Sequence, residues 1–262
     1  MFDSLFLIYL PFIFLFGLII GSFLNCLIWR LYQGESLGGR SYCPNCRHKL
    51  FWYDNIPLLS FILLRGRCRY CQKKISWQYP LVELAVAILF VLSFSNLANK
   101  VFFISNYDFY FTLLRDWLLI IVMTVIFVYD SRWQLIPMNF VWPMTAFLFL
   151  INFLLGISIF KLLLFGLAVA AFFLLQYLIT KKKGIGEGDI WLGLLLGFSF
   201  PNFEHIFLLL FFAYLSGALI GSILSVTKKS KKIALGPFLA FGAIITLIWG
   251  DYLLSHFFRL FF

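Results

Sequence analysis

The amino-acid sequence predicts an all-α polytopic membrane protein of about eight transmembrane helices, with one small loop domain on the cytoplasmic side. Hydrophobic residues make up 63% of its 262 positions, and apolar runs recur along nearly the whole chain. Short clusters of Lys, Arg, Gly and Pro separate these runs. A helix needs about 20 apolar residues to cross about 30 Å of hydrocarbon. The composition therefore excludes an ordinary soluble core and favours repeated membrane crossings.

Eight apolar runs are each expected to form one helix. In chain order they are Leu5–Ile28, Pro80–Leu97, Asp116–Tyr129, Leu135–Gly156, Ile159–Thr180, Asp189–Phe200, Phe203–Val226 and Ile233–His256. We therefore divide the chain into a first transmembrane helix (residues 1–29), a cytoplasmic four-cysteine loop (residues 30–79) and a seven-helix membrane core (residues 80–262).

The basic residues predict the orientation, because Lys and Arg accumulate in cytoplasmic loops. If both termini lie outside, most basic residues fall in inward segments, namely 30–79, 130–134, 181–188 and 227–232. Only Lys100, Arg115, Lys161 and Arg259 then lie on the outer side. Topology thus explains the net charge of +10, and we expect membrane lipid rather than nucleic acid as a partner.

The cytoplasmic loop carries two C-x-x-C pairs, Cys43-Pro44-Asn45-Cys46 and Cys68-Arg69-Tyr70-Cys71. Two such pairs are typical of a zinc ribbon, in which each pair gives two thiolates to one tetrahedral ion. The alternatives are disulfides, which a reducing cytosol disfavours, and a thioredoxin-like redox pair, which lacks its βαβ context here. Cys43, Cys46, Cys68 and Cys71 therefore predict a structural zinc site with no ligand position left open for catalysis.

Two aspartates lie where predicted helices meet water: Asp130 follows Ile126-Phe127-Val128-Tyr129, and Asp189 ends Gly186-Glu187-Gly188-Asp189. Carboxylates are costly so close to lipid, which suggests a function. The predicted topology places both at the cytoplasmic side. We therefore expect a catalytic pair in which one carboxylate activates water and the other, protonated, polarises the scissile carbonyl.

Structural roles are the alternatives for these acidic residues. Asp189 is suited to cap a helix, and Asp130 to pair with Arg132 at the interface. Glu187 is expected to be a solvated loop residue. Predicted helix lengths favour the functional role: roughly 21 Å of rise separates Asp116 from Asp130, and roughly 18 Å separates Asp189 from Pro201. Both values fall short of the hydrocarbon core, so both aspartates are expected roughly 10 Å below the cytoplasmic interface, in a cavity open to water.

Several further motifs occur in a fixed order along the chain. They are Gly21-Ser22-Phe23-Leu24-Asn25, the first cysteine pair, Trp52-Tyr53-Asp54-Asn55-Ile56-Pro57-Leu58-Leu59-Ser60, Leu64-Arg65-Gly66-Arg67-Cys68, Tyr79-Pro80-Leu81-Val82-Glu83, Asp130 with Ile136-Pro137, Gly186-Glu187-Gly188-Asp189, and Gly236-Pro237-Phe238-Leu239-Ala240. Together they resemble the type IV prepilin leader peptidase family, membrane aspartic proteases of the GxGD class.

This resemblance implies that Asp130 and Asp189 are the two catalytic aspartates and that the four cysteines bind zinc. Members of the family remove the basic leader of prepilins or pseudopilins on the cytoplasmic side, after a glycine. Many then methylate the new N-terminal residue with S-adenosylmethionine, and the four-cysteine loop marks this bifunctional branch. The resemblance thus implies an enzyme of the bacterial inner membrane, acting in type IV pilus assembly or type II secretion.

The site of the methyl donor cannot be identified from a motif, since no glycine-rich dinucleotide fingerprint follows a strand. Asp54 and Glu83 are candidates, with a structural hydrogen bond or a snorkelling carboxylate as the alternative for each. The chain also departs from the family pattern, with Met138 where Asp is frequent, Trp191 where Lys is common and Tyr32 where Pro is common. Three other functions stay open: a peptidase-only intramembrane protease, a proton- or cation-coupled transporter, and a metal sensor built on the loop.

Overall fold

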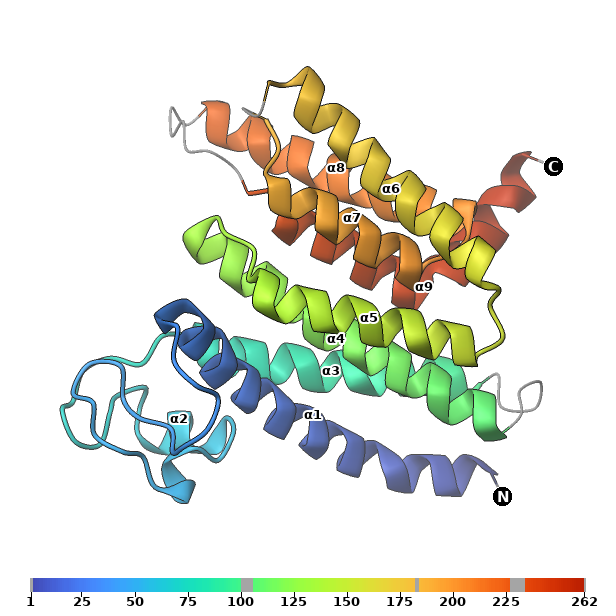
Figure 1. Cartoon of the computed structure of the whole chain (residues 1–262). Coiled ribbons are helices and arrows are strands. Elements are labelled where there is room, and N and C mark those ends of the chain that lie inside the picture. The colour runs from blue at the N-terminus through green and yellow to red at the C-terminus, as the bar shows by residue number, and fades with distance from the viewer. Residues whose placement is uncertain (1, 100–105, 182–183, 227–233, 262) are drawn as a thin grey trace. The chain divides into compact units, whose positions relative to one another are not determined.

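The structure, a computed structural model, describes residues 2–99, 106–181, 184–226 and 234–261 (Figure 1). Within these ranges each predicted crossing corresponds to one helix: α1 (Phe2–Gln33), α3 (Gln78–Ala98), α4 (Asn106–Trp133), α5 (Met138–Leu154), α6 (Ile159–Ile179), α7 (Glu187–Ser199), α8 (Phe203–Val226) and α9 (Gly236–Phe261). Among the described residues, six helices are long and apolar enough to cross a membrane, and α5 and α7 are shorter. The predicted fold class is confirmed.

The helices and the loop form two compact units, residues 1–99 and 100–262. The first unit contains α1, the cysteine loop with the short helices η1 (Trp52–Asp54) and α2 (Leu59–Leu63), and α3. The second unit contains α4 to α9. The functional division into residues 1–29, 30–79 and 80–262 stays a prediction.

In the first unit, glycines let α1 approach α3 closely. A Cβ added to Gly21 would lie 2.6 Å from the Cα of Glu83, so a larger residue would push the two helices apart. One turn further along α1, the buried Asn25 donates a hydrogen bond to the Tyr79 carbonyl oxygen at 3.1 Å and accepts one from the Gln78 amide at 3.1 Å. The Gly21–Asn25 motif therefore forms the seam between α1 and α3.

In the second unit, residues from all six helices share one apolar core. Its buried members include Met123 and Ile126 of α4, Leu148 of α5, Phe173 of α6, Leu195 of α7, Leu209 of α8 and Leu239 of α9. The α6–α7 pair packs closely, since a Cβ on Gly193 would lie only 2.6 Å from the Phe173 ring. Helix α7 is thus enclosed by apolar side chains even though it has only 13 residues.

The α4 helix begins ten residues earlier than predicted. Its first residue is Asn106 rather than Asp116, which is buried within the helix and forms an ion pair with Arg115 at 2.7 Å. From Asn106 to Asp130 the rise is about 36 Å, enough to cross the whole hydrocarbon core. The helix start at Asp116, from which the depth of Asp130 was predicted, is therefore wrong, and the depth itself stays a prediction.

Candidate active site and metal-binding loop

Asp130 lies in the last turn of α4 and is only 5% exposed. Its Oδ2 atom accepts a hydrogen bond of 2.9 Å from the backbone N–H of Gly236, the first residue of α9. The N-terminus of a helix carries partial positive charge, so this contact stabilises an ionised carboxylate. A Cβ on Gly236 would lie 2.5 Å from the same oxygen, which explains why glycine fits this position. Sequence reasoning noted the Gly236–Ala240 motif but missed its contact with Asp130.

Asp189 is the third residue of α7 and is 6% exposed. Its Oδ2 atom accepts a hydrogen bond of 3.0 Å from the backbone N–H of Gly186, just before the helix. This is the capping contact considered as a structural alternative. It occupies one oxygen of the carboxylate and fixes the side chain at the start of α7.

Local packing brings the surroundings of the two aspartates together. A Cβ on Gly188 would lie 2.7 Å from the Cδ1 atom of Ile136, so the residue before Asp189 packs against the segment that follows α4. In the described part of the chain, the protein hydrogen bonds to each carboxylate use Oδ2. Neither Oδ1 atom accepts a hydrogen bond from these two backbone groups.

Glu187 is exposed to solvent, as predicted, but it lies at the start of a helix rather than in a loop and has a hydrogen-bond partner. It is the first residue of α7, and its Oε1 atom accepts a hydrogen bond of 2.6 Å from the hydroxyl of Tyr177 near the end of α6. The adjacent Gln176 accepts a hydrogen bond of 2.8 Å from Tyr214 of α8. These polar contacts join α6, α7 and α8 beside Asp189, and no sequence motif indicated them.

One departure from the family pattern has a structural counterpart. Trp191 packs against Trp142 of α5, with 4.3 Å between the ring centroids. The two tilted indole rings contribute apolar contact between α5 and α7 where a lysine would bring a charge. Nothing in the structure explains Met138.

The four cysteines of the loop form one cluster. Their sulfur atoms all lie within 4.8 Å of one another, and the Cys43 and Cys71 sulfurs are 4.0 Å apart. Four thiolates at about 2.3 Å from a tetrahedral ion are separated by about 3.8 Å, whereas a disulfide requires about 2.05 Å. All five cysteines are free thiols, and Cys26 of α1 is not a member of the cluster. The donor set fits a tetrahedral metal ion and argues against disulfides.

Both cysteine pairs have the same backbone geometry. In the first, the Cys43 N–H bonds to the His48 oxygen and the Arg47 N–H to the Cys43 oxygen; in the second, Cys68 bonds to Lys73 and Gln72 to Cys68 in the same pattern. Arg47 and Gln72 have φ values of 59° and 58°. This repeated turn aims both thiols of each pair at one point, as a shared ion requires.

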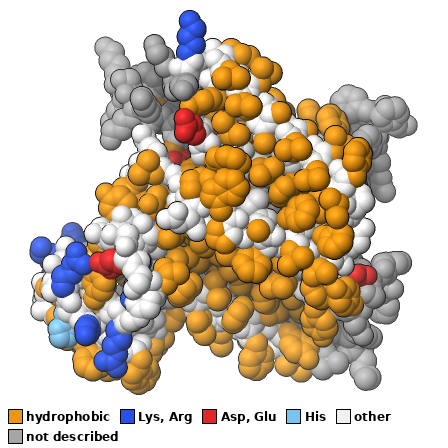
Figure 2. All heavy atoms as spheres, viewed as in Figure 1, with side chains coloured by type: hydrophobic (Ala, Val, Ile, Leu, Met, Phe, Trp, Pro, Cys, Tyr) orange, Lys and Arg blue, Asp and Glu red, His pale blue; other side chains and the backbone are white. Residues whose placement is uncertain are grey.

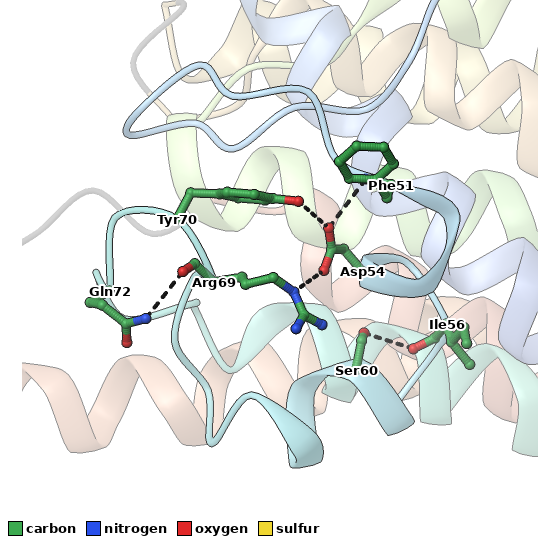
Figure 3. A network of polar contacts seen from close by, with 7 residues as sticks. All are labelled: Phe51, Asp54, Ile56, Ser60, Arg69, Tyr70 and Gln72. Atoms are coloured by element: carbon green, nitrogen blue, oxygen red, sulfur yellow. Dashed lines mark hydrogen bonds and ion pairs between the residues drawn. The ribbon is translucent and has the colours of Figure 1, made fainter.

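Asp54 links the second cysteine pair to the rest of the loop (Figure 3). Its carboxylate accepts hydrogen bonds from Arg69 at 2.8 Å, from Tyr70 at 3.0 Å and from the Phe51 N–H at 3.2 Å. Burial opposes the charged form, but these donors outweigh it and hold the pKa of Asp54 below its ordinary value. Burial and the neighbouring carboxylate raise the pKa of Tyr70 to about 12, so its hydroxyl stays a donor.

Glu83, the other candidate for the methyl-donor site, also has a partner within the protein. It is buried on α3 and accepts a hydrogen bond of 2.8 Å from the backbone N–H of Leu58, just before α2. Asp54 and Glu83 therefore both hold the loop in place, as the structural alternative anticipated.

The fold and these two sites define a class: a polytopic membrane enzyme with a metal-binding loop between its first two long helices. The chain belongs to the type IV leader peptidase family. The model of that family matches residues 117–222, and the model of the bacterial A24 peptidase N-terminal domain matches residues 15–97.

Several curated relatives match along most of their length. A prepilin leader peptidase/N-methyltransferase of Aeromonas hydrophila is 33% identical over 277 residues, covering 93% of this chain and 92% of the relative. The protein of the same name from Bacillus subtilis is 31% identical and covers 96% and 98%. That of Pseudomonas aeruginosa is 30% identical and covers 90% and 89%. No solved structure matches the chain.

Proposed function

We propose that this protein is a membrane aspartic endopeptidase that removes the leader from prepilins or pseudopilins and then methylates the new amino terminus. One observation carries the peptidase assignment: Asp130 and Asp189 are both buried, and each accepts a hydrogen bond from a backbone N–H at the start of a helix. Burying two carboxylates is costly, and catalysis is a reason to retain them. Family membership supports the same function.

The proposed reaction is direct attack by water. One aspartate, ionised, accepts a proton from water through its Oδ1 atom as the oxygen attacks the carbonyl carbon after the leader glycine. The other, protonated, donates a hydrogen bond to the carbonyl oxygen as that oxygen gains charge. Collapse of the tetrahedral intermediate breaks the C–N bond, and the departing amine takes up the proton. The hydrogen bonds from Gly186 and Gly236 hold the two carboxylates in position throughout.

The loop is proposed to hold one structural zinc ion through Cys43, Cys46, Cys68 and Cys71. When bound, zinc supplies tetrahedral ligation that replaces the apolar core a loop of this size lacks. Methylation, with S-adenosylmethionine as the methyl donor, is proposed from family membership and from the presence of this loop. We also propose that the chain lies in the bacterial inner membrane with both termini outside and with the aspartates and the loop at the cytoplasmic side, from its charge distribution.

Cleavage of a prepilin by the purified protein in detergent tests the peptidase. Asp130→Asn and Asp189→Asn should each abolish cleavage, because a neutral amide can neither accept nor share the proton. Asp116→Asn is the matched control, since this carboxylate is also buried in α4 but is paired with Arg115. Substantial cleavage by either aspartate variant would refute the assignment, and a transporter would cleave nothing.

A separate assay tests the proposed methyltransferase activity. Incubation of the protein with prepilin and radiolabelled S-adenosylmethionine should label the mature N-terminal residue. If cleavage proceeds and no label is transferred, the protein is a peptidase only.

A further inference from the structure

The short helix α2 exposes an apolar face. Leu59, Ile62 and Leu63 are spaced i, i+3, i+4 along it, which places their side chains on one side. They are 49%, 68% and 71% exposed. Apolar side chains gathered in this way indicate an interaction surface.

A hydrogen bond fixes the position of α2 along the length of α3. The Leu58 N–H, at the start of α2, bonds to Glu83, which is the sixth residue of α3 and lies about 7.5 Å along it. With 21 residues, α3 has a length of about 31 Å and therefore just spans a hydrocarbon core. The first residue of α3 must then lie at the membrane interface, and α2 is held beside the first turns of α3 (Figure 1).

An aromatic contact fixes which way α2 faces. Phe61 packs against Trp77, with ring centroids 5.0 Å apart, and against Gly66. Trp77 comes just before α3 and is 70% exposed, as is typical of tryptophan at a membrane interface. Because Phe61 faces inward, Ile62 and Leu63 face away from the protein at the level of the interface.

The charge of the surrounding segment complements an anionic surface. Between Asp54 and Glu83 the sequence has no acidic residue, and its basic residues are Arg65, Arg67, Arg69, Lys73 and Lys74. Arg65 and Arg67 follow α2 directly and are exposed. Figure 2 shows basic side chains gathered on the loop, whereas apolar ones cover the helices. Arginines beside an apolar helical face are typical of segments that bind anionic phospholipid.

We propose that α2 is an interfacial anchor: Leu59, Ile62 and Leu63 insert at the boundary of headgroups and acyl chains, and Arg65 and Arg67 bind anionic phospholipid headgroups. The apolar face of α2 thereby continues the lipid-facing surface of α3. The anchor holds the cysteine loop against the membrane rather than leaving it free in solvent.

Site-specific photocrosslinking of the full-length protein tests this proposal. The photoreactive residue benzoylphenylalanine replaces Leu63 in proteoliposomes of phosphatidylglycerol and phosphatidylethanolamine, with and without prepilin. Phe12 of α1, 65% exposed, is the lipid-facing reference, and the exposed Lys73 of the second cysteine pair is the control. Lipid adducts at Leu63 should approach those at Phe12 and exceed those at Lys73 at least about fivefold.

A second measurement tests the contribution of the two arginine charges to lipid binding. Arg65→Gln combined with Arg67→Gln should lower the lipid adducts at Leu63 about threefold or more when phosphatidylglycerol is present, and should have no effect in its absence. Ile62, on the same face, serves as a second probe position if the Leu63 variant shows an altered unfolding temperature. Adducts to prepilin or to a second copy of the chain, or lipid adducts no higher than at Lys73, would overturn the proposal.

Discussion

The Tyr177 hydroxyl donates a hydrogen bond to the Glu187 carboxylate, with 2.6 Å between the two oxygens. Tyr177 is near the end of α6 and is buried, and Glu187 opens α7 two residues before Asp189. The contact therefore fixes the start of the helix that carries one of the proposed catalytic carboxylates. Small displacements of a reacting group lower the rate strongly, so this contact is expected to affect catalysis.

Replacement of Tyr177 by phenylalanine tests that expectation. Tyr177→Phe should lower kcat for prepilin cleavage by roughly five- to tenfold with little change in KM, because only the orientation of Asp189 is loosened. Tyr252→Phe, at an exposed position on α9, is the control and should retain full activity. An unchanged kcat for Tyr177→Phe would show that the hydrogen bond has no role in positioning.

Replacement of Gly236 tests whether the position of the other carboxylate, that of Asp130, affects catalysis. Gly236→Ala places a methyl group 2.5 Å from the Asp130 Oδ2 atom, so the carboxylate must turn away from the helix N-terminus. We expect the cleavage rate to fall at least about tenfold. In Gly217→Ala of α8 the new methyl group meets Phe238 at an ordinary 3.5 Å, and this variant should cleave normally. Equal activity of the two variants would contradict the proposed role of Gly236.

The loop should require its metal. We expect one zinc ion per chain by elemental analysis, and Cys68→Ser should reduce that content because a tetrahedral site loses one ligand. Cys26→Ser should leave it unchanged, since Cys26 is not part of the cluster. Chelation should increase proteolysis within residues 41–76 while α4 to α9 stay folded, because metal ligation substitutes for a core in the loop alone. A metal-free wild-type chain with a protease-resistant loop would refute the site.

Asp54 should stabilise the loop through its charge. Asp54→Asn removes the charged acceptor of Arg69 and should accelerate zinc release to a chelator by roughly five- to tenfold at neutral pH. The pKa of Asp54 is lower in the folded protein than in the unfolded chain, so its contribution is complete above the unfolded value of about 3.9. The contribution is lost as the pH falls through the folded pKa. The ratio of the two release rates should therefore stay constant between pH 5 and pH 8; a ratio that shrinks within this range would identify a different titrating group.

Each helix could be predicted from the sequence because it corresponds to one apolar run, but several helix ends could not. Hydropathy falls at Arg115 and Asp116, which suggested a helix boundary, whereas the two charges pair and are tolerated inside α4. The predicted Leu135 start was early, because Pro137 precedes the first residue of α5. The predicted start of the last helix, Ile233, lies outside the described residues, and α9 is described from Gly236, with Pro237 in its first turn.

The residues of the candidate sites could be predicted from the sequence, whereas most of their partners could not. The cysteine cluster follows from the spacing of its ligands, because each pair closes a local turn. Asp130 and Asp189 were identifiable as costly charges near lipid. Their partners were not, since the Gly236 N–H reaches Asp130 across 106 positions, and the Tyr177–Glu187 contact spans two helices. Such contacts depend on how helices pack, which local sequence does not encode.

Under the proposed role of Asp130, its hydrogen bond from Gly236 makes the last helix a necessary part of a minimal enzyme. A chain cut within residues 227–233 would keep both aspartates, yet Asp130 would lose its donor unless α9 bound back as a separate peptide. A truncated relative that retains both aspartates but lacks the glycine opening its final helix is thus expected to be inactive. Conversely, adding back an α9 peptide gives a means of switching cleavage on in a split protein.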